Sequence, residues 1–240
     1  MKPEIKDLKV KIFADGAEIS DIVEMNNNSL IKGLTTNPTL MRKAGIKNYK
    51  NFAQEVLNFV KVKPISFEVF SDELDEMRKQ ALQISSWGNN VYVKIPVTNT
   101  RGLPTYDLVK YLVNEKVKVN VTAVMTLEQV KSISNSLDAE VPNYVSIFAG
   151  RIADTGRDPI GIMKEAIQIL KPIYSSELIW ASPRELLNIF QASEIGCHVI
   201  TATTDILKKL NLVGLDLSQY SLETVKMFYK DASDSNFSID

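Results

Sequence analysis

The sequence alternates eight times between short apolar runs and longer amphipathic segments over its 240 residues. The apolar runs cover residues 9–16, 30–37, 64–70, 91–98, 118–125, 144–150, 177–182 and 198–203. They are rich in Val, Ile and Phe, which favour strands. The segments between them place apolar residues at helical spacing, as at Leu74, Met77, Ala81 and Ile84. We therefore expect eight strand–helix units.

The spacing of these units indicates the fold class. Each unit averages 240/8 = 30 residues. Regular strand–helix alternation implies parallel strands joined by crossover helices. Eight such units in about 250 residues match a closed barrel. We predict an α/β fold, a (β/α)8 TIM barrel formed by residues 1–240 as a single domain, with an open doubly wound sheet as the alternative.

The C-terminal end adds to this pattern. Residues 221–232 predict one further amphipathic helix, which must pack on the barrel or on another subunit. Residues 233–240 are expected to form a polar, frayed tail.

Composition excludes several classes of protein. Lys plus Arg and Asp plus Glu give a net charge of 28 − 29 = −1, and 45% of the residues are apolar, so neither a disordered chain nor a polybasic nucleic-acid binder is expected. Cys197 and His198 are the only residues of their types, which excludes an intrachain disulfide and a thiolate or multi-histidine metal site. The charged start and the lack of a long apolar run predict a cytoplasmic protein without membrane contact.

Polar residues in the runs fall on one side of the predicted strands. Because strand residues alternate between two faces, Val, Ile and Leu mostly share the face that suits contact with helices, and the polar face would point into the barrel. The residues predicted on the inward, polar face are Asp15 with Phe13, Thr35 with Asn37, Glu68, Lys94, Asn120 with Thr122, Ser146 with Phe148 and Gly150, and Ser182 with Trp180. Ala123 is predicted on the outward face.

This concentration of charge is unusual for a barrel interior, which branched aliphatic side chains normally fill. An unpaired buried charge costs several kcal/mol. Such charges are tolerated at the wet carboxyl-end mouth of a barrel, where active sites lie. The alternative is that Lys94 forms a structural ion pair with Glu68 or Asp15.

The residue types narrow the chemistry. Cys197 and His198 have opposite parity, which disfavours a catalytic dyad. A lysine in the same cavity as the two carboxylates disfavours a metal, and no glycine-rich nucleotide loop is present. A lysine in the apolar strand that contains Lys94 suits Schiff-base chemistry, because desolvation favours the free amine that attacks a carbonyl. Neighbouring carboxylates can divide the proton transfers.

A phosphate site is expected beside this cavity. Arg151 and Arg184 follow the sixth and seventh strands, and Ser182 lies at the end of the seventh. A guanidinium matches phosphate oxygens in a bidentate manner.

Seven segments resemble the transaldolase family, including its small transaldolase and fructose-6-phosphate aldolase branch. They are ADGAEI around Asp15, GLTTNPTL at 33–40, SFEVF around Glu68, VYVKIPVT with Lys94, NVTAVMT at 120–126, SIFAGRIAD at 146–154 and ASPREL at 181–186. The resemblance implies a (β/α)8 barrel and a class I aldolase mechanism without metal or organic cofactor. It also implies transfer of a dihydroxyacetone unit between sugar phosphates.

The resemblance also implies roles for single residues. Lys94 would be the Schiff-base lysine and Asp15 the acid/base carboxylate that handles the proton of the donor hydroxyl. Glu68 would act through a bound water that Thr122 helps to hold. Asn37, Asn120 and Ser146 match positions that bind the dihydroxyacetone part, and Arg151, Ser182 and Arg184 match the phosphate set. The candidate substrate-binding residues are Thr35, Asn37, Asn120, Ser146, Phe148, Arg151, Ser182 and Arg184.

Two positions separate the branches of the family. The aldolase branch tends to have glutamine where this chain has Glu68 and tyrosine where it has Phe148, so the resemblance favours a transferase. The alternatives are an aldolase that releases dihydroxyacetone from fructose 6-phosphate, and a catalytically silent sugar-phosphate binder. Small members often assemble through a C-terminal helix, so residues 221–232 imply a homo-oligomer.

Overall fold

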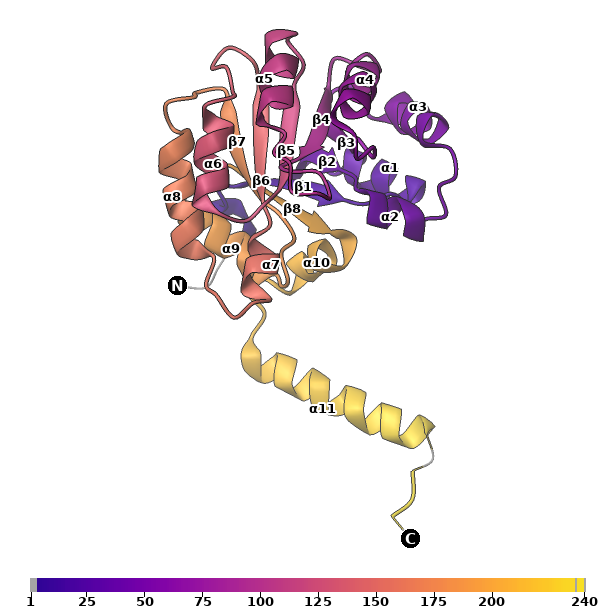
Figure 1. Cartoon of the computed structure of the whole chain (residues 1–240). Coiled ribbons are helices and arrows are strands. Elements are labelled where there is room, and N and C mark those ends of the chain that lie inside the picture. Colours follow the sequence, from indigo (N-terminus) through magenta and orange to yellow (C-terminus); the bar gives the residue numbers. More distant parts are fainter. Residues whose placement is uncertain (1–3, 236, 240) are drawn as a thin grey trace.

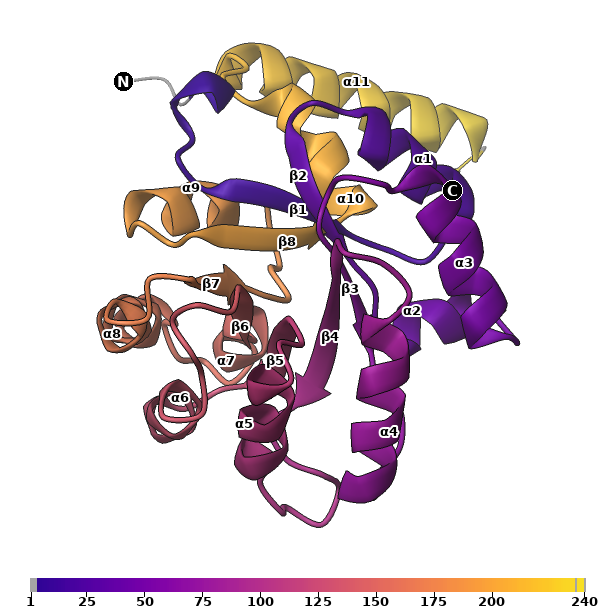
Figure 2. The same cartoon turned by 90° about the horizontal axis from the view of Figure 1, so that it is seen from above.

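A closed barrel of eight parallel strands forms the centre of the molecule (Figure 2). The computed structural model describes residues 4–235 and 237–239. The strands pair in sequence order and β1 pairs with β8, so the predicted (β/α)8 barrel is confirmed and the open doubly wound sheet is excluded. The strands are β1 Lys11–Asp15, β2 Ile31–Thr35, β3 Ile65–Glu68, β4 Val91–Pro96, β5 Val119–Val124, β6 Asn143–Ile147, β7 Ser176–Trp180 and β8 Val199–Thr203.

Helices surround the barrel and cover its apolar outer face (Figure 2). In α4, Met77, Ala81 and Ile84 are buried, as their spacing predicts. The α-helices of the described residues are α1 Ile19–Asn27, α2 Pro38–Lys43, α3 Tyr49–Phe59, α4 Leu74–Ser85, α5 Tyr106–Asn114, α6 Leu127–Ser134, α7 Ala149–Ala153, α8 Ile160–Leu170, α9 Leu187–Glu194, α10 Thr204–Lys208 and α11 Leu217–Asp234. Short 3₁₀ helices span Ile5–Asp7 and Lys209–Leu212.

The barrel has a small apolar core of its own, separate from the larger core between strands and helices. Phe13 lies in the inner core, whereas its neighbours Ile12 and Ala14 lie in the outer core, which confirms the predicted alternation in β1. Gly33 makes room for the Phe13 ring, because a Cβ at this position would lie 2.5 Å from it. Tyr92 and Tyr144 belong to the same inner core. Lys94 and Ser146 follow two residues later, so a polar layer lies above the apolar one.

The predicted alternation is wrong at two places. Trp180 packs in the outer core, although its predicted parity is that of Ser182. Ala123 lines the barrel cavity, although its predicted parity is outward. Trp180 keeps the alternation of β7, in which Ile179 and Ala181 face the inner core, and Ser182, with a φ of 59°, is the residue that leaves it. Ala123 itself has a φ of 61°. Such a conformation breaks the alternation of side chains and is uncommon outside glycine.

Helix α11 leaves the barrel and projects away from it (Figure 1). It begins four residues before the predicted range 221–232 and ends two residues after it, so Ser233 and Asp234 of the predicted tail are helical. None of its residues is buried, so it does not pack into the core of its own barrel. Positions 236 and 240 of the predicted tail lie outside the described residues. Within the described parts of the chain, every helix is too short or too polar to cross a membrane.

Candidate active site

A polar cavity of about 540 Å³ opens at the carboxyl ends of the strands. Parallel strands of a closed barrel place their carboxyl ends around one mouth, where the active sites of such barrels lie. Every predicted site residue except Asn120 lines this cavity. The predicted residues that line it are Asp15, Thr35, Asn37, Glu68, Lys94, Thr122, Ser146, Phe148, Arg151, Ser182 and Arg184.

Lys94 extends into the cavity from the middle of β4. Its amine lies 2.9 Å from Glu68 Oε2 and donates a hydrogen bond of 2.8 Å to the Thr36 carbonyl. The β3–β4 register pairs Glu68 with Lys94, so adjacent strands place both side chains at one level. The side chains of Lys94 and Glu68 are 7% and 16% exposed, so the pair is shielded from bulk water and still open to the cavity.

The ion pair that the sequence leaves open as an alternative is therefore present. A purely structural ion pair would be enclosed by packed side chains. A buried ion pair stabilises a protein only when neighbouring groups also satisfy the hydrogen-bonding capacity of both charges. Here both members line an open cavity, and Asp15 lines it with them. The geometry thus combines an ion pair with an accessible amine.

Asp15, the last residue of β1, is held by two neighbours. Its Oδ1 accepts a hydrogen bond of 2.8 Å from the Thr35 hydroxyl, and its Oδ2 accepts one of 3.2 Å from the Asn37 amide. Asn37 also caps α2, since its Oδ1 accepts from the Leu40 amide at 3.0 Å. Burial raises the pKa of Asp15, against the opposing attraction of Lys94. A carboxyl group whose pKa lies above its usual range is suited to proton transfer in both directions.

Thr201 of β8 extends this arrangement. Its hydroxyl lies 2.6 Å from that of Thr35, which in turn donates to Asp15. Thr201 lines the cavity, and our sequence analysis missed it. The available signal was its position in the eighth run, of which only His198 was weighed, together with the preceding Cys197.

Thr122 lies on β5, next to the irregular backbone at Ala123. Its Oγ1 is buried and has no hydrogen-bond partner among the described residues. A buried hydroxyl without a partner is costly. Because Thr122 lines the cavity, a molecule bound there can satisfy its hydroxyl.

Asn120 lies beneath the cavity and is fully buried. Its amide donates to the Ser66 hydroxyl at 3.1 Å, and its carbonyl oxygen accepts from the Ser146 hydroxyl at 2.7 Å. Ser146 itself reaches the cavity. Asn120 therefore supports Ser146 from below, and its direct contact with a substrate stays a prediction.

The predicted phosphate residues gather on one side of the mouth. Arg151 is on α7 and lies over the Phe148 ring, with its guanidinium carbon 5.7 Å from the ring centre. Arg184 binds Asp154 with two nitrogens, one at 2.9 Å. This guanidinium is therefore held in a fixed direction at the edge of the cavity.

Gly150 allows α7 to approach the segment after β7. A Cβ at position 150 would lie 1.5 Å from the Ser182 carbonyl oxygen. Any side chain at this position would push the two segments apart. The glycine thus brings Arg151 and Ser182 to one cavity although 31 residues separate them in the sequence.

The sole cysteine and histidine have separate structural contacts. Cys197 Sγ is buried and donates to the carbonyls of Leu178 and Val199. Burial raises the pKa of this thiol to about 12, so it is not a nucleophile at neutral pH. His198 Nδ1 accepts a hydrogen bond from the Leu178 amide at 3.0 Å.

Lys43, on α2, was also missed by the sequence analysis and adds a cation to the lining of the mouth. It carries no motif of its own. Only the turn of α2 over the end of β2 brings it there.

A closed (β/α)8 barrel with a charged, polar cavity at its carboxyl mouth defines a barrel enzyme. The sequence profile described as Transaldolase/Fructose-6-phosphate aldolase matches residues 12–239. The chain therefore belongs to the transaldolase/fructose-6-phosphate aldolase family.

Individual relatives agree with this family. The chain is 36% identical to a probable transaldolase of Thermoplasma volcanium over 204 residues, 84% of this chain and 87% of that protein. It is 31% identical to a probable transaldolase of Thermoanaerobacter sp. over 224 residues, 93% of this chain and 98% of that protein. A probable transaldolase of Dehalococcoides mccartyi is 32% identical over 202 residues, 84% of this chain and 90% of that protein. These relatives match the chain over most of their own length.

Proposed function

We propose that this enzyme is a transaldolase that carries a dihydroxyacetone unit on Lys94. The observation that carries the proposal is the shielded Lys94 amine, 2.9 Å from one carboxylate and sharing a cavity with a second, Asp15. An amine attacks a ketone only in its neutral form. Glu68 Oε2 is a base within hydrogen-bond reach of the proton that the ammonium must lose.

The first half-reaction joins donor and enzyme. The neutral Lys94 amine attacks the C2 carbonyl carbon of a ketose phosphate such as fructose 6-phosphate or sedoheptulose 7-phosphate. The carbonyl oxygen leaves as water, and an iminium forms. Asp15 takes the proton of the C4 hydroxyl as the C3–C4 bond breaks, and the bonding electrons move into the iminium. The aldose phosphate leaves, and an enamine remains on Lys94.

The second half-reaction reverses these steps with a new aldose phosphate. The enamine carbon attacks the aldehyde carbon, and the new hydroxyl takes its proton from Asp15. Water then adds to the iminium, the Lys94 amine leaves, and the product ketose is released. The same carboxyl group is first a base and then an acid, which its raised pKa favours.

The other lining residues have supporting roles in this proposal. Besides its direct contact with Lys94, Glu68 acts through a water molecule, and the unpartnered Thr122 hydroxyl provides a second hydrogen bond for that water. Thr35 and Asn37 orient Asp15, and Ser146 offers its hydroxyl to the dihydroxyacetone part. Arg151, Ser182 and Arg184 hold the phosphate at the mouth, with Phe148 beneath the Arg151 guanidinium.

We expect transfer to dominate over release of free dihydroxyacetone. Fructose 6-phosphate alone should be consumed slowly, and addition of erythrose 4-phosphate should speed its consumption by at least about tenfold, because the enamine then has an acceptor. Glyceraldehyde 3-phosphate formation, followed with a coupled reductase, measures both rates. Rapid turnover without the acceptor would identify an aldolase instead.

We further propose that α11 joins copies of this chain. Its apolar side chains lie in the open: Val225 is 60% exposed and Phe228 63% exposed, and Leu222 precedes them at helical spacing. The helix projects away from its own barrel (Figure 1), so a second copy can cover this stripe.

Substitution of Val225 and Phe228 by glutamate should lower the mass of the native particle to that of a monomer, because charges then replace the apolar contact. Sedimentation velocity measures this change. Lys226→Glu on the same helix is the matched control and should leave the mass unchanged. A native protein that already sediments as a monomer would contradict the proposal.

A further inference from the structure

The backbone of Glu68 lies at the end of β3, beyond the last residue of β3 that pairs with β2. Along β3, alternate residues direct their backbone groups to β4 and to β2. The Val69 amide donates to the Lys94 carbonyl of β4, and the Ser66 carbonyl accepts from the Thr36 amide on the β2 side. Glu68 has the parity of Ser66, so its backbone groups face β2.

Strand β2 does not extend far enough to meet them. The β2–β3 pairing consists of Leu34 with Ile65 and Thr35 with Ser66, and β2 ends at Thr35. The chain then turns into α2 at Asn37, its N-cap. Without another partner, the amide and carbonyl of Glu68 would be left open at the end of the strand.

Tyr49, the first residue of α3, takes the place of the missing strand. Its hydroxyl accepts from the Glu68 amide at 2.8 Å and donates to the Glu68 carbonyl at 2.8 Å. Asn48 caps α3 by accepting from the Asn51 amide, which holds the start of the helix and its tyrosine in place. One phenol thus satisfies both backbone groups of a residue that faces the cavity.

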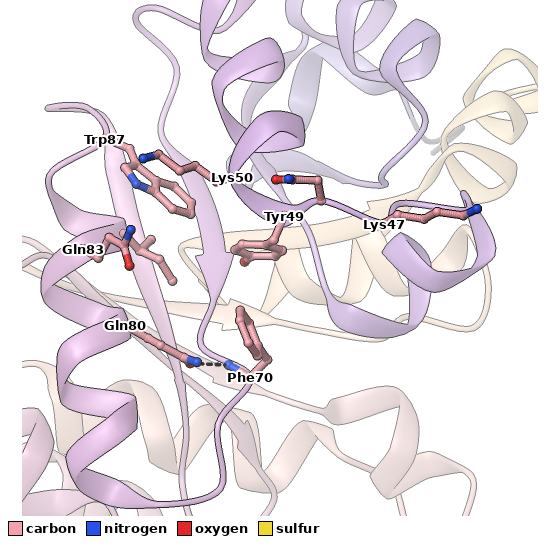
Figure 3. Close-up of a pocket in the computed structure, with 9 residues that line it drawn as sticks. Lys47, Tyr49, Lys50, Phe70, Gln80, Gln83 and Trp87 are labelled. Atoms are coloured by element: carbon pink, nitrogen blue, oxygen red, sulfur yellow. Dashed lines mark hydrogen bonds between the residues drawn. The ribbon is translucent and has the colours of Figure 1, made fainter.

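The ring of Tyr49 is held in turn by other aromatic rings. Figure 3 shows it between the Trp87 and Phe70 side chains. The ring centres lie 5.8 Å apart for Trp87, 5.5 Å for Phe70 and 6.3 Å for Phe67, with the phenylalanine rings packed edge-on. These contacts leave the hydroxyl little freedom to move from Glu68.

The hydroxyl also keeps its proton. Burial raises the pKa of Tyr49 above its ordinary value, so the phenol stays neutral throughout the working pH range. Only the neutral phenol can donate to the carbonyl while it accepts from the amide.

We propose that Tyr49 is a positioning residue that places the Glu68 carboxylate against the Lys94 amine. It does not line the catalytic cavity, so it acts through the backbone of Glu68 and not on substrate. The proposal rests on the role of Glu68 in the proposed function. No motif of the sequence marks this residue, because the contact joins the start of a helix to a strand end 19 residues later.

Tyr49→Phe tests the proposal, since it removes the hydroxyl and keeps the ring. We expect kcat to fall about 5- to 30-fold, with the KM for the ketose phosphate within about twofold, because misplacement of a catalytic group slows chemistry more than binding. In a Glu68→Gln background the same substitution should cause no further loss. Equal or additive losses in the two backgrounds would overturn the proposal.

Two further variants separate positioning from loss of stability. Phe70→Leu removes one ring contact of Tyr49 and keeps its hydroxyl, so it should lower the melting temperature with a smaller fall in kcat than Tyr49→Phe causes. Tyr111→Phe on α5 removes the hydroxyl of an exposed tyrosine that does not line the catalytic cavity, and it should change neither. A fall in kcat for Phe70→Leu as large as that for Tyr49→Phe would show a general packing effect and reject positioning.

A crystal structure of Tyr49→Phe makes the test independent of turnover. The Glu68–Lys94 distance should exceed the 2.9 Å of the native chain by more than 1 Å or the carboxylate should occupy several positions. An unchanged ion pair would overturn the proposal. Failure of the native enzyme to form an adduct at Lys94 would reject the proposed function alone, and the variant's geometry would still decide the role of Tyr49.

Discussion

Replacement of Lys94 by methionine should lower kcat/KM for fructose 6-phosphate by more than about 10³-fold, because the proposed covalent mechanism loses its nucleophile. Methionine keeps much of the length of the lysine side chain, so it should occupy the same space in the cavity. The coupled assay with erythrose 4-phosphate measures the loss. Reduction of native enzyme and donor with borohydride, followed by peptide mass mapping, should place the trapped sugar on Lys94.

Lys131→Met, on the exposed surface of α6, is the matched control and should keep full activity. Lys94→Met also leaves Glu68 without its partner, which is costly for a shielded charge. Thermal melting of both variants must therefore accompany the kinetics. A folded Lys94→Met enzyme that still turns over, or a trapped sugar on another lysine, would contradict the assignment.

Asp15→Asn should lower kcat by about 10² to 10⁴-fold, the usual contribution of a positioned acid or base. An amide cannot take the proton of the donor hydroxyl, so the carbon–carbon bond should not break. Schiff-base formation does not need this proton transfer. Borohydride should therefore still trap the donor on Lys94 in the variant, which separates cleavage from imine formation in one experiment.

Asp75→Asn on α4, where the carboxylate is exposed beside Arg78, is the matched control and should leave kcat unchanged. An Asp15→Asn enzyme with near-native kcat would assign the proton transfer to another group. In the native enzyme, a raised pKa means that Asp15 holds its proton at pH values where an ordinary carboxyl has lost it. The acid limb of the kcat profile should accordingly lie above the ordinary carboxyl range near pH 4 and rise as the pH increases.

The sequence was sufficient to predict the barrel and most of the residues that line its cavity. Each strand is a short apolar run, and its ends fall within a few residues of the predicted boundaries. Because the side chains of a strand alternate, parity alone selected Asp15, Glu68 and Lys94 as inward-facing residues, and all three line the cavity. The phosphate residues Arg151 and Arg184 followed from their positions just past strand ends and from guanidinium chemistry, and the resemblance to a known family added roles for single residues.

Parity failed where the backbone departs from a regular strand. Ser182 and Ala123 line the cavity because each has a left-handed backbone conformation, which breaks the alternation, whereas Trp180 packs outward in step with the rest of β7. Neither Ser182 nor Ala123 is a glycine, so no sequence pattern predicts these backbone conformations.

The order of residues along the chain thus determined which groups can meet: eight parallel strands bring their carboxyl ends to one mouth, and alternation directs an amine and two carboxylates into it. Only the tertiary structure decided which of them touch. The Glu68–Lys94 pair depends on the β3–β4 register, the Thr201–Thr35–Asp15 chain on closure of β8 against β1, and the support of Glu68 on the place where α3 starts. These contacts join segments far apart in sequence, and their geometry is set by packing of the whole barrel, which no local pattern encodes.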